Sequence, residues 1–320
     1  MPRSQLIGLL ILTFCLLSIL TAEPQVKKQI IILVPDSLSS LPFYLVAEKQ
    51  PLPGYKLKVE NFTQHAQALI KLVRGDAELL FTGTTQGWQS LWDGNDLVAI
   101  NSYVWGVSSL VVKDSSIKSI GNLKDKKIAL PFPNSPLDVK TRKILDYYGL
   151  GNPPQVQIEY RPFAQSIPLL LAGSLDAIAL PEPQATQLVL NNHLTRLFEY
   201  QTVWAKVTAD PIGKGLSPEV TLYAMKKQAK DLAQALKDLD AELGLIIKDL
   251  RSLTDDITLR YSQRLNLKPE VFQEALAHIS FWAPLFSTHQ KESLLYYEQI
   301  KNYFTSPVGK LSNDFFFSYH

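Results

Sequence analysis

The chain has 320 residues, of which 46% are hydrophobic and 19% are charged, and its formal net charge is +2. This is an ordinary globular composition, and the length suits one large domain or two of medium size. The charges are balanced and no run of Lys or Arg occurs. Nucleic acid is therefore not expected as a partner, because phosphate binding needs a concentrated basic face.

The N-terminus has the order of a secretory signal peptide. Arg3 carries a positive charge, residues 6–20 form a mainly apolar run, and Thr21 and Ala22 are small. We therefore expect residues 1–22 to be a signal peptide and the protein to be exported, to the periplasm or the outer face of the cytoplasmic membrane. The run is too short for a comfortable transmembrane helix. An uncleaved anchor stays open, because Leu20 is not a small residue.

Cys15 is the only cysteine, and it lies inside the apolar run. The residue before it is Phe14, whereas a lipoprotein signal needs a small residue at that position. The mature chain would then have no thiol, which excludes disulfides, thiolate metal sites and a cysteine nucleophile.

Apolar runs and helical patterns alternate in the first part of the mature chain. Strands are expected at 30–34, 56–60 and 77–81. Each of them is followed by a polar loop and then by a helical pattern. Two further strands, at 97–101 and 107–112, are expected to complete the same sheet. Alternation of this kind predicts parallel sheets that helices cover on both faces.

The stretch 127–138 predicts a strand, a proline-rich loop and an immediate helix start. Ser135 is the expected N-cap, Pro136 fits the first helical position, and Asp138 has the spacing of a capping box. A strand that leads into a helix N-terminus leaves backbone N–H groups free beside a crevice, which suits an anionic or polar ligand group.

The pattern of the first part then repeats. Forty-six positions separate Ile30 from Asp76, and 48 separate Ile128 from Asp176, with a Gly/Asp turn and a strand at the end of each unit. Two such units predict two similar α/β lobes with a cleft and hinge between them.

The last third of the chain is mostly helical after a strand at 220–225. Leu232, Leu236, Leu239, Leu243 and Leu250 recur at helical spacing and predict one long helix whose apolar face packs in the core. Further helices are expected to start at Thr254, Pro269 and Ser287. We interpret this region as a return to the first lobe, so that lobe 1 comprises residues 23–112 and 206–320, and lobe 2 residues 113–205.

The sequence lacks recognisable catalytic and metal-binding motifs. The five histidines show no metal-ligand spacing, and no nucleophile elbow, phosphate-binding loop or dinucleotide-binding motif is present. We expect no catalysis, no metal and no cofactor.

Polar and aromatic residues do recur where strands end, which is where open α/β sheets bind ligands. Taken alone, each polar residue is more often a helix cap than a ligand contact. Aromatic residues accompany them, among them Phe43, Trp88, Phe132 and Phe163. The candidate ligand-binding residues are Asp36, Ser37, Ser39, Tyr44, Thr63, Gln64, Thr82, Gly83, Thr84, Trp105, Asn134, Ser135 and Glu182.

The order and spacing of several segments resemble the sulfonate, nitrate and thiamine-precursor binding proteins of ABC importers. The segments are 75–77, 120–129, 173–177 with Glu182 and Pro183, and 308–316. The resemblance implies the two-lobed type II periplasmic binding protein fold, each lobe a mainly parallel sheet flanked by helices. It also implies a receptor that closes over one small molecule and delivers it to a membrane permease with its ATPase. We expect a monomer.

The candidate loops contain no arginine, whereas Asp36 and Glu182 could accept hydrogen bonds from a ligand's N–H groups. This favours a nitrogen heterocycle, such as a thiamine-precursor pyrimidine, over a sulfonate. Two alternatives stay open: an enzyme of cofactor biosynthesis on the same fold, and a sensor that presents its ligand to a membrane receptor. The signal sequence opposes a cytoplasmic enzyme, and the lack of cysteine after Cys15 opposes the iron-dependent pyrimidine synthase of fungi.

Overall fold

The computed structural model describes residues 28–151, 153–208 and 215–319. The expected signal peptide and Cys15 lie outside the described residues. Within those ranges, no helix is both long and apolar enough to cross a membrane.

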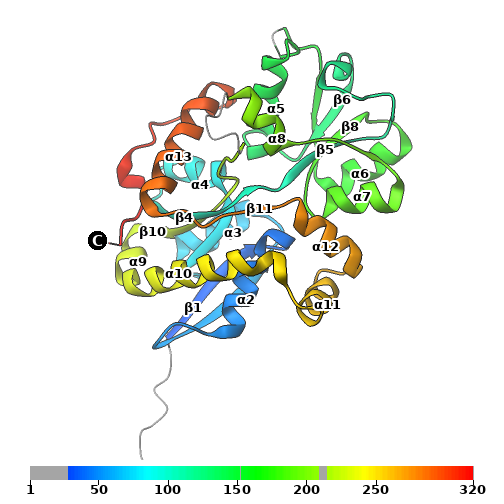
Figure 1. The fold of residues 1–320 in the computed structure, drawn as a ribbon. Helices are drawn as coiled ribbons and strands as arrows, with labels where there is room; N and C mark the ends of the chain where they lie inside the picture. Colours follow the sequence, from blue (N-terminus) through cyan, green and yellow to red (C-terminus); the bar gives the residue numbers. More distant parts are fainter. Residues whose placement is uncertain (1–27, 152, 209–214, 320) are drawn as a thin grey trace, which may run out of the picture.

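The described chain forms two β-sheets, one low in the view of Figure 1 and one at its upper right. The first sheet has the order β11-β4-β10-β3-β1-β2. Its strands are β1 (Lys28–Pro35), β2 (Tyr55–Phe62), β3 (Leu79–Gly83), β4 (Leu97–Gly106), β10 (Val220–Met225) and β11 (Ser280–Phe281). The second sheet has the order β7-β6-β8-β5-β9. Its strands are β5 (Ser108–Val112), β6 (Lys127–Leu130), β7 (Gln157–Tyr160), β8 (Ala177–Pro181) and β9 (Thr195–Glu199).

The two sheets repeat one topology, as the sequence spacing predicted. In the first sheet β1 pairs in parallel with β2 and β3, and in the second β6 pairs in parallel with β7 and β8. An antiparallel strand follows in each, β10 beside β3 and β5 beside β8. The Gly/Asp turns before β3 and β8 also match, because Gly75 and Gly173 both adopt the left-handed conformation, with φ of 79° and 81°.

The prediction that 107–112 joins the first sheet is wrong. Only Val107 separates β4 from β5, and β5 pairs antiparallel with β8 and β9 of the second sheet. A run of apolar residues specifies a buried strand but not the sheet that it joins. The lobe boundaries as a whole stay a prediction, and we propose that the first crossing between lobes lies at Val107 rather than after residue 112.

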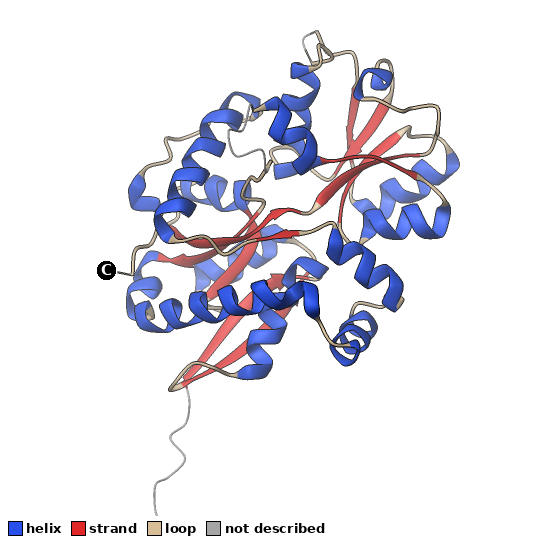
Figure 2. Ribbon diagram, in the orientation of Figure 1, coloured by secondary structure: helices blue, strands red, loops and turns tan. Residues whose placement is uncertain are grey.

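Helices flank both sheets (Figure 2). The helices that precede β10 in the chain are α2 (Leu41–Lys49), α3 (His65–Arg74), α4 (Thr84–Trp92), α5 (Pro136–Tyr147), α6 (Phe163–Ala172), α7 (Gln184–Asn192) and α8 (Tyr200–Val207). Those that follow β10 are α9 (Lys226–Asp231), α10 (Ala233–Asp249), α11 (Asp255–Arg264), α12 (Pro269–Ala277) and α13 (Phe286–Ile300). The starts expected at Thr254 and Pro269 are confirmed, the first as an N-cap and the second as the first helical residue.

The leucine stripe of the C-terminal third is core packing, as expected. Leu236, Leu239 and Leu243 lie on α10, are almost completely buried, and belong to the apolar core beneath the first sheet. Strand β10 enters that sheet between β3 and β4, so the C-terminal third of the chain contributes a strand to the first sheet.

A substitution at Gly87 on α4 tests how tightly this helix packs on the first sheet. A Cβ at Gly87 would lie 2.1 Å from Cζ of Tyr223, a buried residue of β10. We expect Gly87→Ala to lower the free energy of unfolding by about 1–3 kcal/mol, because the tyrosine must move. Urea denaturation measures the change.

Gly244→Ala on α10 is the matched control. The nearest atom to its Cβ is 3.8 Å away, so alanine fits and should raise stability by about 0.4–1 kcal/mol. Equal stability of the two variants would contradict the packing described for α4.

Candidate functional site

A cavity of about 320 Å³, which we call the inner cavity, lies between the two sheets. Residues that follow β1, β2 and β3 face residues that follow β6, β7 and β8, so the same positions of the repeated unit line it from opposite sides. The first sheet and the segments next to its strands contribute Pro35, Asp36, Ser37, Ser39, Phe62, Thr63, His65, Gly83, Gln86, Glu219 and Val220. From the second sheet and the crossing before it come Val107, Ser108, Pro131, Phe132, Ser135, Pro136, Leu137, Phe163, Pro181 and Gln184.

Several helices start at the inner cavity. The N-cap residues of α3, α4 and α6 make no side-chain capping hydrogen bond, although the first N–H of α4, at Thr84, donates to the backbone carbonyl of Glu219 at 3.0 Å. Helix α5 is capped as predicted, because Ser135 Oγ accepts a hydrogen bond from the backbone N–H of Asp138 at 3.1 Å. Uncapped first turns present N–H groups and the positive end of the helix dipole, which favour an anionic or polar ligand group.

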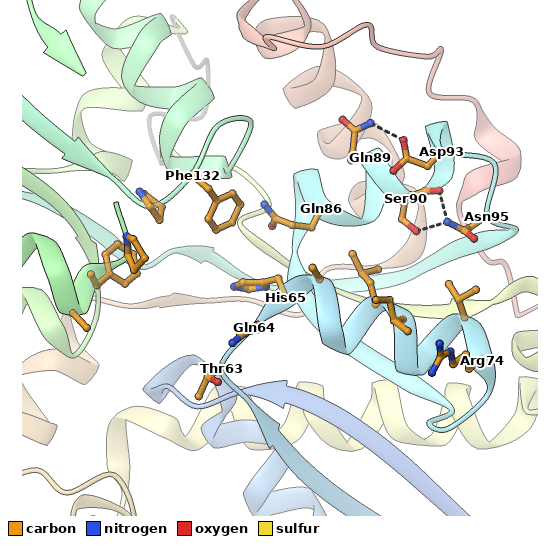
Figure 3. A pocket seen from close by; sticks show the side chains of 18 residues that line it. Thr63, Gln64, His65, Arg74, Gln86, Gln89, Ser90, Asp93, Asn95 and Phe132 are labelled. Carbon is orange, nitrogen blue, oxygen red and sulfur yellow. Dashed lines mark hydrogen bonds between the residues drawn. The ribbon is translucent and has the colours of Figure 1, made fainter. Parts of the chain in front are cut away.

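His65, the first residue of α3, lies at the boundary between the two halves. Its Nδ1 is 2.6 Å from Thr82 Oγ1, and its ring lies 5.9 Å from the ring of Phe132 on the opposite side (Figure 3). Burial lowers the pKa of His65 to about 4. The imidazole is therefore neutral near pH 7 and can donate or accept a hydrogen bond without adding charge.

An ion pair at the edge of the inner cavity joins the two halves of the fold. Lys140 Nζ on α5 lies 2.5 Å from Glu219 Oε1, just before β10, and both side chains are almost completely buried. Lys140 also donates to Ser217 Oγ at 3.0 Å. Its Nζ lies 5.7 Å and 5.5 Å from the ring centroids of Tyr200 and Trp204. The charge of Glu219 is thus neutralised, and no Lys or Arg occurs among the described residues that line the cavity.

Gln184 presents a polar atom that has no partner within the described chain. It is the first residue of α7 and lines the inner cavity, and its Oε1 is buried without a hydrogen bond. A buried acceptor without a partner is costly. A ligand donor in the cavity would satisfy it.

No family model matches the sequence, and the curated proteins contain no match. Solved structures do match over most of the chain. The alkanesulfonate-binding protein SsuA from Xanthomonas axonopodis pv. citri, bound to MOPS, has a TM-score of 0.69 at 21% identity, covering 90% of this chain and 97% of that one. A ligand-binding component of an ABC-type import system from Staphylococcus aureus, with zinc bound, has a TM-score of 0.68 at 16% identity, covering 91% and 96%.

A third match names the architecture. The Candida albicans CA3427 gene product, described as having the generic periplasmic binding protein structural fold, has a TM-score of 0.63 at 12% identity, covering 86% of this chain and 90% of that one. This chain has the periplasmic binding protein fold. The fold expected from the resemblance is therefore confirmed, with sheets that are parallel over three strands and antiparallel beyond them.

Within this periplasmic binding protein fold, the structure brings part of the predicted site together. The candidates that line the inner cavity are Asp36, Ser37, Ser39, Thr63, Gly83 and Ser135. Phe132 and Phe163, two of the expected aromatic residues, line it too. Gly83 has a packing role, because a Cβ there would lie 1.8 Å from Gln86 Oε1, so its absence leaves room for the Gln86 amide.

Glu182 does not reach the cavity. Its side chain is fully buried, Oε1 accepts a hydrogen bond from Arg196 Nη1 at 2.5 Å, and Oε2 accepts one from the backbone N–H of Thr186 at 3.1 Å. Arg196 therefore neutralises the Glu182 carboxylate that was expected to contact the ligand. The carboxylate instead connects the first turn of α7 to β9.

Trp105 is also structural. It is buried, and its indole N–H lies 2.9 Å from the carbonyl of Ser102 and 3.1 Å from that of Trp282. The Trp105 and Trp282 ring centroids lie 4.9 Å apart. Both polar and apolar surfaces of Trp105 are therefore occupied by the protein itself.

The other candidates lie around the cavity rather than in its wall. Tyr44 accepts a hydrogen bond from Asn61 at 2.8 Å and stacks on Tyr261. Thr84 bonds Thr221 at 2.8 Å, while Asn134 bonds Ser306 and Thr305. The last two candidates flank the site: Thr82 lies behind His65, and Gln64 lines an adjoining hollow along α3 rather than the inner cavity.

The sequence reasoning missed His65, Gln86, Ser108, Gln184 and Glu219. His65 lies one position after the chosen Gln64, and Gln86 lies two positions after the chosen Thr84, so the turn after each strand was the available signal. Ser108 is the first residue of β5 and Glu219 directly precedes β10, and the sequence pattern does not reveal the place of these antiparallel strands in the sheets.

Glu182→Ala tests the structural role of this carboxylate. We expect the free energy of unfolding to fall by about 3–5 kcal/mol, because Arg196 is left buried without its partner. Urea denaturation measures the loss. Glu159→Ala is the control: its partner Arg161 is exposed, so the expected loss is below about 1 kcal/mol. Weakened ligand binding at unchanged stability would instead make Glu182 a ligand contact.

The low pKa of His65 predicts a pH dependence of stability. The unfolded chain takes up this proton near the ordinary pKa of 6.5, and the folded protein only near 4. Stability is therefore lost as the pH falls from about 6.5 to 4. Replacing the histidine, as in His65→Gln, should reduce this loss when unfolding is followed by urea at pH 7, 5.5 and 4.5. His193→Gln, at an exposed histidine, is the control, and an unchanged profile for His65→Gln would contradict the prediction.

Proposed function

We propose that this protein is the solute-binding protein of an ABC importer, that it is exported, and that it binds one small molecule in the inner cavity without catalysis. The observation that carries the proposal is that equivalent strand ends of two similar sheets meet around one cavity. The likeness to SsuA and to a ligand-binding component of an ABC-type import system supports it. The partners would be a membrane permease and its ATPase.

Binding would work through closure of the two lobes. A ligand that contacts both walls of the inner cavity stabilises the closed arrangement by its differential affinity for it. His65 and Phe132 already lie near one another across the cavity, so a small change in the distance between the lobes alters the space available to the ligand. We propose that the protein acts as a monomer, since one chain supplies both walls.

The structure changes our preference for the ligand. The nitrogen heterocycle was favoured by Glu182 and Asp36, but Glu182 is paired with Arg196, and Asp36 is exposed and accepts a hydrogen bond from Asn61 at 2.7 Å. The uncapped N-termini of α3, α4 and α6 favour acceptor oxygens on the ligand. We therefore propose a sulfonate as the first candidate, in keeping with the MOPS-bound relative in fold.

A nitrogen heterocycle is the second candidate. Gln184 Oε1 needs a hydrogen-bond donor, which a ring N–H or amino group supplies and a sulfonate does not. Phe132 and Phe163 provide aromatic surfaces of the kind on which a flat ring stacks.

Native mass spectrometry of the purified protein, followed by thermal-shift titration with sulfonates, nitrate, pyrimidines and amines, tests the proposal. We expect one small molecule per chain and a raised melting temperature with one class of ligand. Gln184→Leu should weaken binding of a donor-bearing ligand by about 3- to 10-fold without lowering the melting temperature of the empty protein.

Gln187→Leu, on the same helix but outside the cavity, is the matched control and should bind as the wild type does. A protein that purifies empty and is stabilised by no member of the panel would refute the proposed function.

A further inference from the structure

Residues 302–306, which we call the latch segment, follow α13 in the chain and contact both halves of the fold. In the first half, the ring of Phe304 lies 5.4 Å from the ring of Trp92 on α4, edge to face. The hydroxyl of Ser306 donates a hydrogen bond to Gln89 Oε1, also on α4, at 3.3 Å. The latch segment is therefore fixed to a helix that packs on the first sheet.

The latch segment also bonds to α5 of the second half and to the loop before it. Asn134 Oδ1 accepts hydrogen bonds from the backbone N–H of Thr305 at 2.8 Å and from the Thr305 hydroxyl at 3.0 Å. Asn134 Nδ2 donates to Ser306 Oγ at 3.0 Å. The Tyr303 hydroxyl donates to Asp146 Oδ2, near the end of α5, at 2.9 Å. One amide and one carboxylate thus connect the second half to the latch segment.

The loop that contains Asn134 forms part of the cavity wall. Residues 131, 132 and 135–137 of this loop line the inner cavity. Asn134 has a left-handed backbone conformation, with φ of 61°, which asparagine adopts more readily than most residues. Its backbone N–H donates to Asp138 Oδ2 at 2.7 Å. The loop is therefore held in shape at α5 and is fixed to the latch segment through the Asn134 side chain.

The latch segment connects two walls of one hollow. Gln89 on α4 and Phe132, two residues before Asn134, both line the hollow along α3 that adjoins the inner cavity (Figure 3). The Ser306 hydroxyl lies within hydrogen-bond distance of both Gln89 and Asn134. A bridge between two walls of one hollow opposes their separation.

The contact between the latch segment and α5 is suited to breaking and re-forming. A space of about 470 Å³ lies beside it, and Arg142, Asp146, Tyr303 and Thr305 are among the residues that line this space. The bonds of the contact are individual hydrogen bonds at the protein surface. Each contributes little net stability, because water replaces the lost partner when the bond breaks.

We propose that residues 302–306 form a latch that holds the cavity walls of the two lobes close together, and that release of the latch allows the lobes to separate. This inference rests on the proposed function for its purpose, since it names a device that regulates closure over the same site. A protein whose lobes are already held near one another needs less of the ligand's binding free energy for closure.

Double electron–electron resonance between two spin labels measures the separation of the lobes without a ligand. Lys71→Cys on α3 and Gln165→Cys on α6 provide exposed label positions in the two halves, and Cys15→Ser removes the one native cysteine. We expect a narrow distance distribution in the dialysed full-length protein. Asn134→Gly keeps the left-handed backbone and removes the amide, so it should raise the ratio of wide to narrow arrangements by about tenfold.

Tyr303→Phe is a second, milder variant. It removes only the hydrogen bond to Asp146 and should shift the same ratio by about threefold in the same direction. It also tests the latch if Asn134→Gly does not fold. Asn266→Gly is the matched control, because Asn266 is exposed after α11 and also has a positive φ, of 52°. This control should leave the distances unchanged.

Three outcomes would overturn the inference. Unchanged distances in both Asn134→Gly and Tyr303→Phe would show that the latch segment does not hold the lobes. Shorter distances would show that it keeps the walls apart, and an equal shift in Asn266→Gly would assign the effect to glycine itself. Because no ligand is used, failure of the ligand panel would refute the proposed function and leave the latch standing.

Discussion

The buried ion pair between Lys140 and Glu219 constrains how the two halves of this fold meet. It joins helix α5 of the second half to the start of β10 in the first sheet, at the edge of the inner cavity. Two charges removed from water are stable only when each is fully satisfied. Lys140 meets a carboxylate, a hydroxyl and two aromatic rings, so the cavity edge is held in place without an unpaired charge.

Repetition of one topology explains why a single cavity forms. Each unit places three parallel strands with their carboxyl ends toward the same space, and each then receives an antiparallel strand from outside the unit. Strand β5 enters the second sheet directly from β4, and β10 enters the first from the C-terminal third. The described chain therefore passes from one sheet to the other between β4 and β5 and again between β9 and β10.

The polar groups that the cavity offers to a ligand depend on which charges the surrounding residues already neutralise. Arg196 has neutralised Glu182, Lys140 has neutralised Glu219, and burial keeps His65 uncharged near neutral pH. What is left for a ligand is uncapped helix N-termini, hydroxyl groups, the amide of Gln184 and aromatic surface.

The sequence by itself determined the local features: the alternation of strands and helices, the repeat, the Ser135 cap, the Gly75 and Gly173 turns and the α10 leucine stripe. These depend on residues within a few positions of one another, and the loops after β1 and β2 were recognisable for the same reason. Only the tertiary structure decided the sheet that β5 joins, the pairing of Glu182 with Arg196 and the arrival of Glu219 at the cavity. Those outcomes depend on which distant segments meet, because a carboxylate binds a ligand or an arginine according to the partner that the fold brings to it.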